Sequence, residues 1–165
     1  MRAISVMQPW AHAIIIGRKQ VENRGRQHPW RSGIGERIAI HASLQLDDAA
    51  RGHRAMRNYI AALREHDRRT THGAILGTVL LVGVHPAGTR SCECNPAYAV
   101  SGQYHLVLED FRALDVPIDC RGALGLWTVP DDVERGIAFQ LTTLDEARDE
   151  PDEDPDQPDT MELFA

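Results

Sequence analysis

The chain has 165 residues, enough for one domain with a substantial core and too few for two domains of ordinary size. Its apolar runs are all shorter than the roughly 20 residues that a membrane-spanning helix needs, which argues against an integral helical membrane protein. The net charge of −6 is unevenly spread, because residues 1–121 carry 16 Lys and Arg against 11 Asp and Glu, whereas residues 122–165 carry 2 against 13. A basic body followed by an acidic end is compatible with a polyanionic partner.

The first predicted elements are a strand at residues 3–6 and a helix that follows it. Pro9 suits the first turn of that helix, because the N–H that proline lacks would be unsatisfied there, and Gly17 suits its C-terminal end. Residues 37–43 alternate as a strand does. Residues 47–67 carry apolar side chains every three or four positions, which predicts an amphipathic helix with arginines on its outer face.

The second half of the chain is dominated by apolar runs separated by turn residues. Further strands are predicted at residues 74–85, 105–114 and 123–129, with a loop at 86–102 and one or two short helices between Pro130 and about Asp149. Strands that mostly follow one another without helical crossovers favour an α+β fold, a small β-barrel or strongly curved sheet of about five to six strands with flanking helices. We predict one domain over residues 1–136 and an acidic, largely disordered tail over 137–165.

The chain has three cysteines, an odd number that does not make a disulfide framework, and its start lacks the features of a signal peptide. We therefore expect free thiols and a cytoplasmic location. Cys92 and Cys94, with His85, His105 and Cys120 elsewhere in the chain, raise the question of a zinc site. Their C-x-C spacing differs from the usual C-x₂₋₄-C and no second close pair exists, so we expect neither a metal nor a cofactor.

The stretch ISVMQPWAHAIIIGRKQVENR, residues 4–24, resembles the opening of ASCH domains, which belong to the PUA-like superfamily. The family pattern G-x-K-x-x-E-x-R falls on Gly17, Lys19, Glu22 and Arg24, and IAIHAS and CRGALGLW look like later strands of the family. The resemblance covers about residues 2–130. It implies a small PUA-like barrel with a cleft beside the Lys19 loop, and RNA or modified bases as ligands. Some small relatives remove an acyl group from N4-acetylcytidine, and others have been linked to RNA cleavage.

Lys19 is the only lysine among 18 basic residues. An ammonium group can lose its proton when it is buried or crowded by cations, whereas a guanidinium cannot. Arg18, Arg24 and Arg26 would favour the neutral amine and Glu22 would oppose them. A neutral Lys19 could serve as a general base; the alternative is an ammonium that pairs with Glu22 or with a phosphate.

The chain departs from the amidohydrolase relatives at one position of this loop. Those relatives use a Lys-x-x-Thr loop and a distant glutamate, the threonine being their presumed nucleophile. Glu22 stands where the threonine would be and has no hydroxyl to acylate, while Glu93 could match the distant glutamate. A water-mediated hydrolysis that uses Lys19 and Glu22 therefore remains the weaker alternative.

Aromatic and polar residues near the loop are candidate ligand contacts. Trp10 and Trp30 flank the loop and could stack on an unpaired base, with a role in the core as the alternative. His41 and Ser43 share one face of a predicted strand and could hydrogen-bond a base. The remaining candidate contacts are Arg24, Arg26, Gln103, Tyr104 and Arg121.

The reading favoured by these observations is a nucleic-acid-binding module that recognises RNA or a modified nucleoside in a cleft beside the Lys19-Glu22-Arg24 loop. DNA stays open as a ligand, and no membrane partner is expected. The alternative is a small hydrolase that acts on a modified nucleoside or on RNA. A third reading is a protein partner that binds through the acidic tail.

Overall fold

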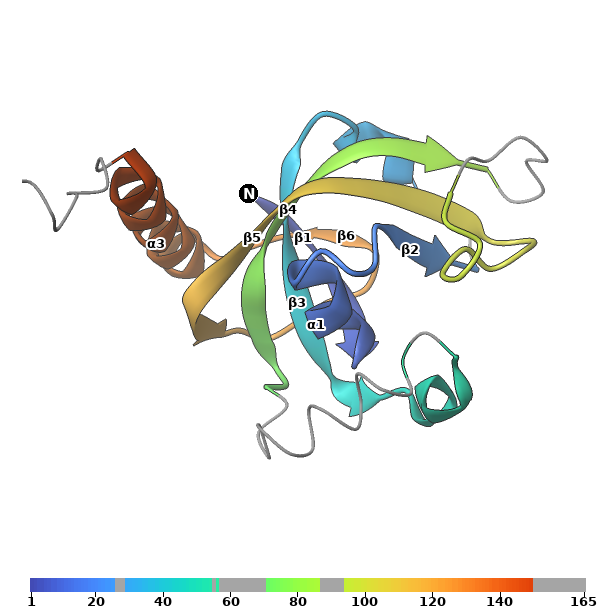
Figure 1. Ribbon diagram of the computed structural model, residues 1–165. Helices are drawn as coiled ribbons and strands as arrows, with labels where there is room; N and C mark the ends of the chain where they lie inside the picture. Colours follow the sequence, from blue (N-terminus) through green and yellow to red (C-terminus); the bar gives the residue numbers. More distant parts are fainter. Residues whose placement is uncertain (26–28, 55, 57–70, 87–93, 150–165) are drawn as a thin grey trace, which may run out of the picture.

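The computed structural model describes residues 1–25, 29–54, 56, 71–86 and 94–149. One six-stranded sheet organises them, with the strand order β2-β5-β4-β3-β1-β6 (Figure 1). The strands are β1 (Arg2–Gln8), β2 (Val21–Arg24), β3 (Arg37–Leu46), β4 (Ala74–His85), β5 (Tyr104–Asp119) and β6 (Leu126–Thr128). The helices are α1 (Trp10–Ile15) and α3 (Asp131–Asp149), with short 3₁₀ helices η1 (Trp30–Gly33) and η2 (Asp48–Gly52). The predicted α+β class is confirmed.

The sheet is mixed and strongly curved (Figure 1). β1 and β3 pair in parallel, while the other neighbouring strands pair antiparallel. The long pair of β4 and β5 contains three shifts of register, and such bulges increase the local twist of a sheet. One of them lies at Gly77, where an added Cβ would come within 2.3 Å of the Arg112 carbonyl oxygen. Glycine is therefore needed where the backbones of β4 and β5 approach.

The curvature brings the two ends of the sheet toward each other. Among the described residues, β2 and β6 are the edge strands of an open ladder, so backbone hydrogen bonds do not close the expected barrel. A side chain spans the gap instead, because Arg24 on β2 donates through Nη2 to the Ser5 carbonyl oxygen on β1 at 2.9 Å. The loop between α1 and β2 is thereby held over the interior of the curved sheet.

The middle of the sheet is buried on both faces. Ile38 and Ile40 on β3 point into the main core, which also contains residues of α1, while Ala39 between them belongs to a second core beneath α3. Side chains of a strand alternate between its two faces, so each face has its own cover. This double burial explains why the central strands read as apolar runs rather than as alternating patterns.

The C-terminal helix extends across the expected boundary between residues 136 and 137. The helix predicted to end near Asp149 is present as the single helix α3, so the boundary expected between residues 136 and 137 falls inside a helix. Ile137, just past that boundary, is fully buried in the second core. Residues 150–165 lie outside the described part of the chain. Over the described ranges, no helix combines the length and apolarity needed to cross a membrane.

The predicted helix over 47–67 begins as the 3₁₀ helix η2. The Asp47 carboxylate accepts a hydrogen bond from the Ala49 N–H, which fixes the first turn, and Gly52 ends the element. Residues 57–70 lie outside the described residues. η2 matters for the site because it places His53 next to α1.

Candidate ligand-binding site

A cavity of about 280 Å³ lies beside β2, and we call it the Lys19 cavity. Its charged residues are Lys19, in the loop before β2, Glu22 on β2, and Asp47, which follows β3. Its aromatic residues, Trp10, His53 and Tyr98, come from α1 and from two loops. Residues from segments that are far apart in the sequence thus line one cavity.

Lys19 is 2% exposed and forms part of the cavity lining. The backbone N–H groups of Arg18 and Lys19 both donate to the Ala13 carbonyl at the end of α1, which fixes the course of the loop. The Lys19 Nζ donates to Glu22 Oε2 at 2.6 Å and to the Val21 carbonyl oxygen. An ammonium has three N–H donors, so one remains after these two bonds.

Glu22 is held between two cations. Its Oε2 accepts from Lys19, and its Oε1 lies 3.3 Å from Nη2 of Arg24. Burial disfavours the charged carboxylate, but the charges of Lys19 and Arg24 and a hydrogen bond from Lys19 outweigh burial and lower the pKa of Glu22. Glu22 therefore remains a carboxylate at neutral pH.

The charged neighbours of Lys19 bear on its two possible roles. Its nearest charged partner is the Glu22 carboxylate, while the Arg24 guanidinium contacts the far oxygen of that carboxylate. Arg18 is exposed, and Arg26 lies outside the described residues. Among the described residues, the Lys19 side chain is thus paired with Glu22.

Trp30 and Arg24 lie near the cavity but do not line it. Trp30 is 4% exposed, belongs to the main core and has the Arg24 guanidinium 5.4 Å from its ring centroid. The core and the Arg24 guanidinium thus cover the Trp30 ring. Arg24 in turn contacts Glu22 and the Ser5 carbonyl, so it positions the carboxylate.

The aromatic wall is a row of three rings. Trp10 donates through Nε1 to Asp47 Oδ2 at 2.7 Å, and its ring meets His53 edge to face at 5.0 Å between centroids. His53 stacks on Tyr98 with centroids 6.0 Å apart and an interplanar angle of 15°. The Lys19 Nζ lies 5.8 Å from the centroid of the Trp10 ring. Charge and flat apolar surface therefore adjoin each other in the cavity.

Asn23 holds the loop segment that carries Tyr98 and Val100. Its amide Nδ2 donates to the Tyr98 carbonyl at 2.8 Å, and its Oδ1 accepts from the Val100 N–H at 2.9 Å. The predicted contact Gln103 also lines the cavity. Sequence reasoning missed Asp47, as well as Asn23, His53 and Tyr98; the only available signal for Asn23 was its place between Glu22 and Arg24 in the motif.

Three predicted contacts lie in a second, more open hollow of about 630 Å³, which we call the His41 hollow. His41, Ser43 and Arg121 line it, and Leu124 forms a largely exposed part of its rim. His41 Nε2 lies 2.9 Å from the Cys120 carbonyl oxygen, and burial lowers the pKa of the ring despite that contact. The structure therefore divides the predicted site residues between two hollows.

The other predicted residues have different places. Tyr104 packs against the main core and pairs with Arg24 across β2 and β5. Glu93, like Arg26, lies outside the described residues. The expectation of free thiols is confirmed for Cys120 and wrong for Cys94, which is disulfide-bonded.

Comparisons with known proteins give a likeness to solved structures alone. No family model matches the chain, and no curated protein matches it. An ASCH protein from Zymomonas mobilis is 17% identical, with 87% of this chain and 94% of that chain covered and a TM-score of 0.49. Two mutant proteins of the same ASCH are also similar. One is 15% identical, with 84% of this chain and 96% of that chain covered and a TM-score of 0.49. The other is 16% identical, with 87% of this chain and 94% of that chain covered and a TM-score of 0.48.

These structures are of an ASCH protein, and ASCH is the family that the sequence motifs resemble. Identities and TM-scores at this level transfer no function and no residue role.

Proposed function

We propose that the chain is an RNA-binding module that takes an unpaired base or a modified nucleoside into the Lys19 cavity. The observation that carries the proposal is the buried ion pair of Lys19 and Glu22 beside an aromatic wall. Burying two charges costs desolvation free energy and is a weak route to stability, so such a pair in a cavity points to ligand recognition.

The cavity suits one small flat group. Its volume of about 280 Å³ lies near the lower end of the range of ~300–1,000 Å³ for small-molecule sites. A single nucleoside is a better match than a run of several nucleotides. Single-stranded RNA is commonly recognised through bases that are splayed out of the stack and laid against aromatic rings.

The polar groups of the cavity are complementary to the edge of a base. Lys19 keeps one N–H donor, the Glu22 carboxylate is an acceptor, and Gln103 offers an amide that both donates and accepts. Trp10 and Tyr98 supply ring faces. The surplus of basic residues over 1–121 adds attraction for phosphates, and the family resemblance points to the same ligand class.

Binding is favoured over hydrolysis by the state of Glu22. A carboxylate whose pKa is lowered by Lys19 and Arg24 is a weak proton acceptor at neutral pH, and Lys19 donates to it. The hydrolase reading would need one of the two to take up a proton. The ion pair fits the orientation of a ligand better.

The test is calorimetric titration with a panel of unmodified and acylated nucleosides and with short single-stranded RNA, followed by mass spectrometry of the recovered ligand. We expect saturable binding, loss of binding in the double variant Lys19→Met/Glu22→Leu, and unchanged ligand mass. The matched control is Arg2→Met/Glu36→Leu, which removes an exposed ion pair of 2.6 Å elsewhere and should bind normally. Absence of binding to every ligand would refute the proposal, and deacylated or cleaved product would favour the hydrolase.

A further inference from the structure

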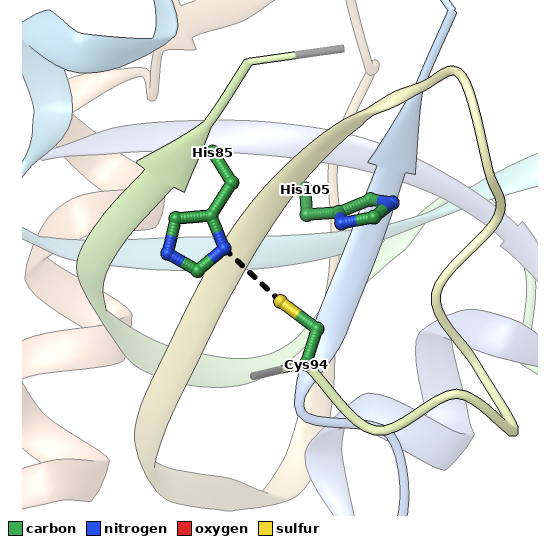
Figure 2. A group of neighbouring side chains, drawn as sticks. All are labelled: His85, Cys94 and His105. Atoms are coloured by element: carbon green, nitrogen blue, oxygen red, sulfur yellow. Dashed lines mark hydrogen bonds between the residues drawn. The ribbon is translucent and has the colours of Figure 1, made fainter. Parts of the chain in front are cut away.

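A second group of ligand-type side chains lies outside the Lys19 cavity. His85 ends β4, His105 lies near the start of β5, and the two residues are register partners across the pair of strands. Cys94 reaches them from the connection between these strands (Figure 2). One nitrogen of each histidine and the Cys94 sulfur all lie within 4.8 Å of one another.

We propose that His85, Cys94 and His105 form a site for a zinc-type divalent cation once Cys94 is reduced. Imidazole nitrogen and thiolate sulfur are the ligands that Zn²⁺ prefers, and three protein ligands leave a fourth position for water. The inference does not depend on the RNA-binding proposal, because it concerns other side chains and another ligand.

The distances suit this assignment. With Zn–N of about 2.0–2.1 Å and Zn–S of about 2.3 Å, a tetrahedral ion separates the nitrogen and sulfur ligands by ~3.5 Å. His85 Nδ1 and the Cys94 sulfur are 3.1 Å apart, joined by the dashed line in Figure 2. These two atoms would move apart by only a few tenths of an ångström to hold the ion, and a nitrogen of His105 lies within 4.8 Å of both.

The hydrogen bonding of His105 prepares it as a ligand. Its Nε2 lies 2.8 Å from the Val100 carbonyl oxygen, which can only accept, so Nε2 carries the proton. In the neutral ring Nδ1 then keeps the lone pair that a metal needs. A metal-binding histidine is ordinarily oriented through a bond of this kind from its other nitrogen.

The oxidation state of Cys94 controls the site. Cys94 is disulfide-bonded in this structure, so its sulfur is not available as a thiolate. A phosphine reductant and one water convert the disulfide to two thiols, and the phosphine becomes its oxide. Binding of the cation then replaces the Cys94 thiol proton, which is released to solvent. The cation should therefore bind to the reduced protein and not to the oxidised one.

The site is connected to the wall of the Lys19 cavity. Val100, which accepts from His105, also donates from its N–H to Asn23 and lines the cavity. A cation that holds His105 and Cys94 together would restrain the segment that carries Tyr98 and Val100. Amide hydrogen exchange at these two positions should slow when the cation binds.

The experiment titrates Co²⁺ into the full chain, reduced with a phosphine, and follows visible absorption; Zn²⁺ is then added in competition. We expect a tetrahedral Co²⁺ spectrum with a thiolate charge-transfer band, displaced by Zn²⁺, and no such band in the oxidised protein. Cys94→Ser should remove the charge-transfer band, and His85→Gln or His105→Gln should weaken Zn²⁺ binding roughly tenfold or more. Cys120→Ser and His72→Gln are the matched controls and should bind as the wild type does.

The wild-type spectrum keeps the proposal falsifiable even where a variant fails to fold. Absence of a thiolate band in the reduced wild type would overturn the site. A band that survives Cys94→Ser would assign the ligand to another cysteine, which also overturns it. Equal Zn²⁺ affinity in the oxidised and reduced proteins would overturn the redox control.

Discussion

The Lys19 cavity and the His41 hollow each contain a buried ionisable side chain, but its partners differ. In the cavity the partner is an opposite charge, and in the hollow it is a neutral carbonyl group. Lys19 and Glu22 form an ion pair at 2.6 Å, and Arg24 adds a second cation beside the Glu22 carboxylate. His41 has a carbonyl partner for Nε2, while its Nδ1 is buried without a hydrogen-bond partner among the described residues. Burial lowers the pKa of His41 and favours its neutral form.

The surroundings differ in the same sense. Three stacked or edge-on rings wall the Lys19 cavity, whereas the rim of the His41 hollow includes exposed aliphatic side chains such as Leu44 and Leu124. A compensated charge beside an aromatic face can select a ligand by both hydrogen bonding and stacking. A neutral imidazole in an open apolar hollow offers neither to the same degree, so we propose the Lys19 cavity as the ligand-binding site.

The largest expected effect comes from breaking the ion pair of the Lys19 cavity. Glu22→Ala should destabilise the protein by about 3–5 kcal/mol, because the Lys19 ammonium is left buried without its partner. Urea unfolding of the variant and of the wild type measures the difference. Glu109→Ala, an exposed carboxylate on β5, should change stability by less than about 0.5 kcal/mol.

The double variant Lys19→Met/Glu22→Leu separates stability from ligand binding. Replacing a buried pair by apolar side chains of similar size is often neutral for stability, so this variant should unfold close to the wild type while binding no nucleoside. If the free energy of unfolding of the double variant is instead as low as that of Glu22→Ala, the ion pair is needed for the fold. Loss of nucleoside binding in the double variant would then not show that the pair contacts the ligand.

The aromatic wall should contribute the next largest effect. Tyr98→Ala should weaken nucleoside binding by about 1–3 kcal/mol, the range measured when a stacking ring is removed. The matched control is Phe139→Ala, an exposed ring on α3 that lines neither hollow, and it should bind normally. Equal affinity of the Tyr98 variant and the wild type would exclude stacking on this wall.

The two hollows should respond to acid in different pH ranges. The pKa of His41 is lowered by burial, so the unfolded state binds the proton more readily and stability falls as the pH drops below the ordinary value of 6.5. The pKa of Glu22 is also lowered, so its contribution is complete above the ordinary value of 4.5 and is lost as the pH falls through the lower folded value.

Unfolding free energies between pH 4 and pH 8 measure the first effect. His41→Asn should flatten the slope below pH 6.5, while Ser43→Ala in the same hollow should leave the slope unchanged. A slope that His41→Asn does not alter would show that other groups cause it.

The smallest effect is expected at the rim of the His41 hollow. Leu124 is 98% exposed, so Leu124→Ser removes almost no buried apolar surface and should change the free energy of unfolding by less than about 0.5 kcal/mol. Nucleoside affinity should not change either. A clear loss of affinity would move ligand binding from the Lys19 cavity to this hollow.

The sequence predicted the fold best where burial on both faces made strands into apolar runs. Residues 74–85 were predicted as a strand and form β4 with the same ends. β5 extends to Asp119, past its predicted end at 114. The sequence did not predict this extension because the second half of the strand is mostly exposed and carries few apolar residues. Pairing with β4 forms that half of the strand, and such pairing leaves no local pattern in the sequence.

The site was predictable only where its residues are close in sequence. The motif brought Lys19 and Glu22 together within four residues, and the structure shows them in contact. Trp30 was chosen for its nearness to the motif, although a ring near the loop in sequence can still point into the core. Tyr98 and His53 come from loops that only tertiary packing brings together. The C-x-C spacing likewise argued against a metal at His85, Cys94 and His105, although strand register places the two histidines side by side.

The most direct test uses the indole N–H signals of the three tryptophans in a nitrogen-15 NMR titration with a nucleoside. Trp10 lies in the wall of the Lys19 cavity, Trp127 meets His41 edge to face at 5.7 Å, and Trp30 is in the core. The account predicts a saturable shift of the Trp10 signal while the Trp127 signal stays in place. A shift of Trp127 without Trp10, or no shift of either at saturating nucleoside, would contradict it.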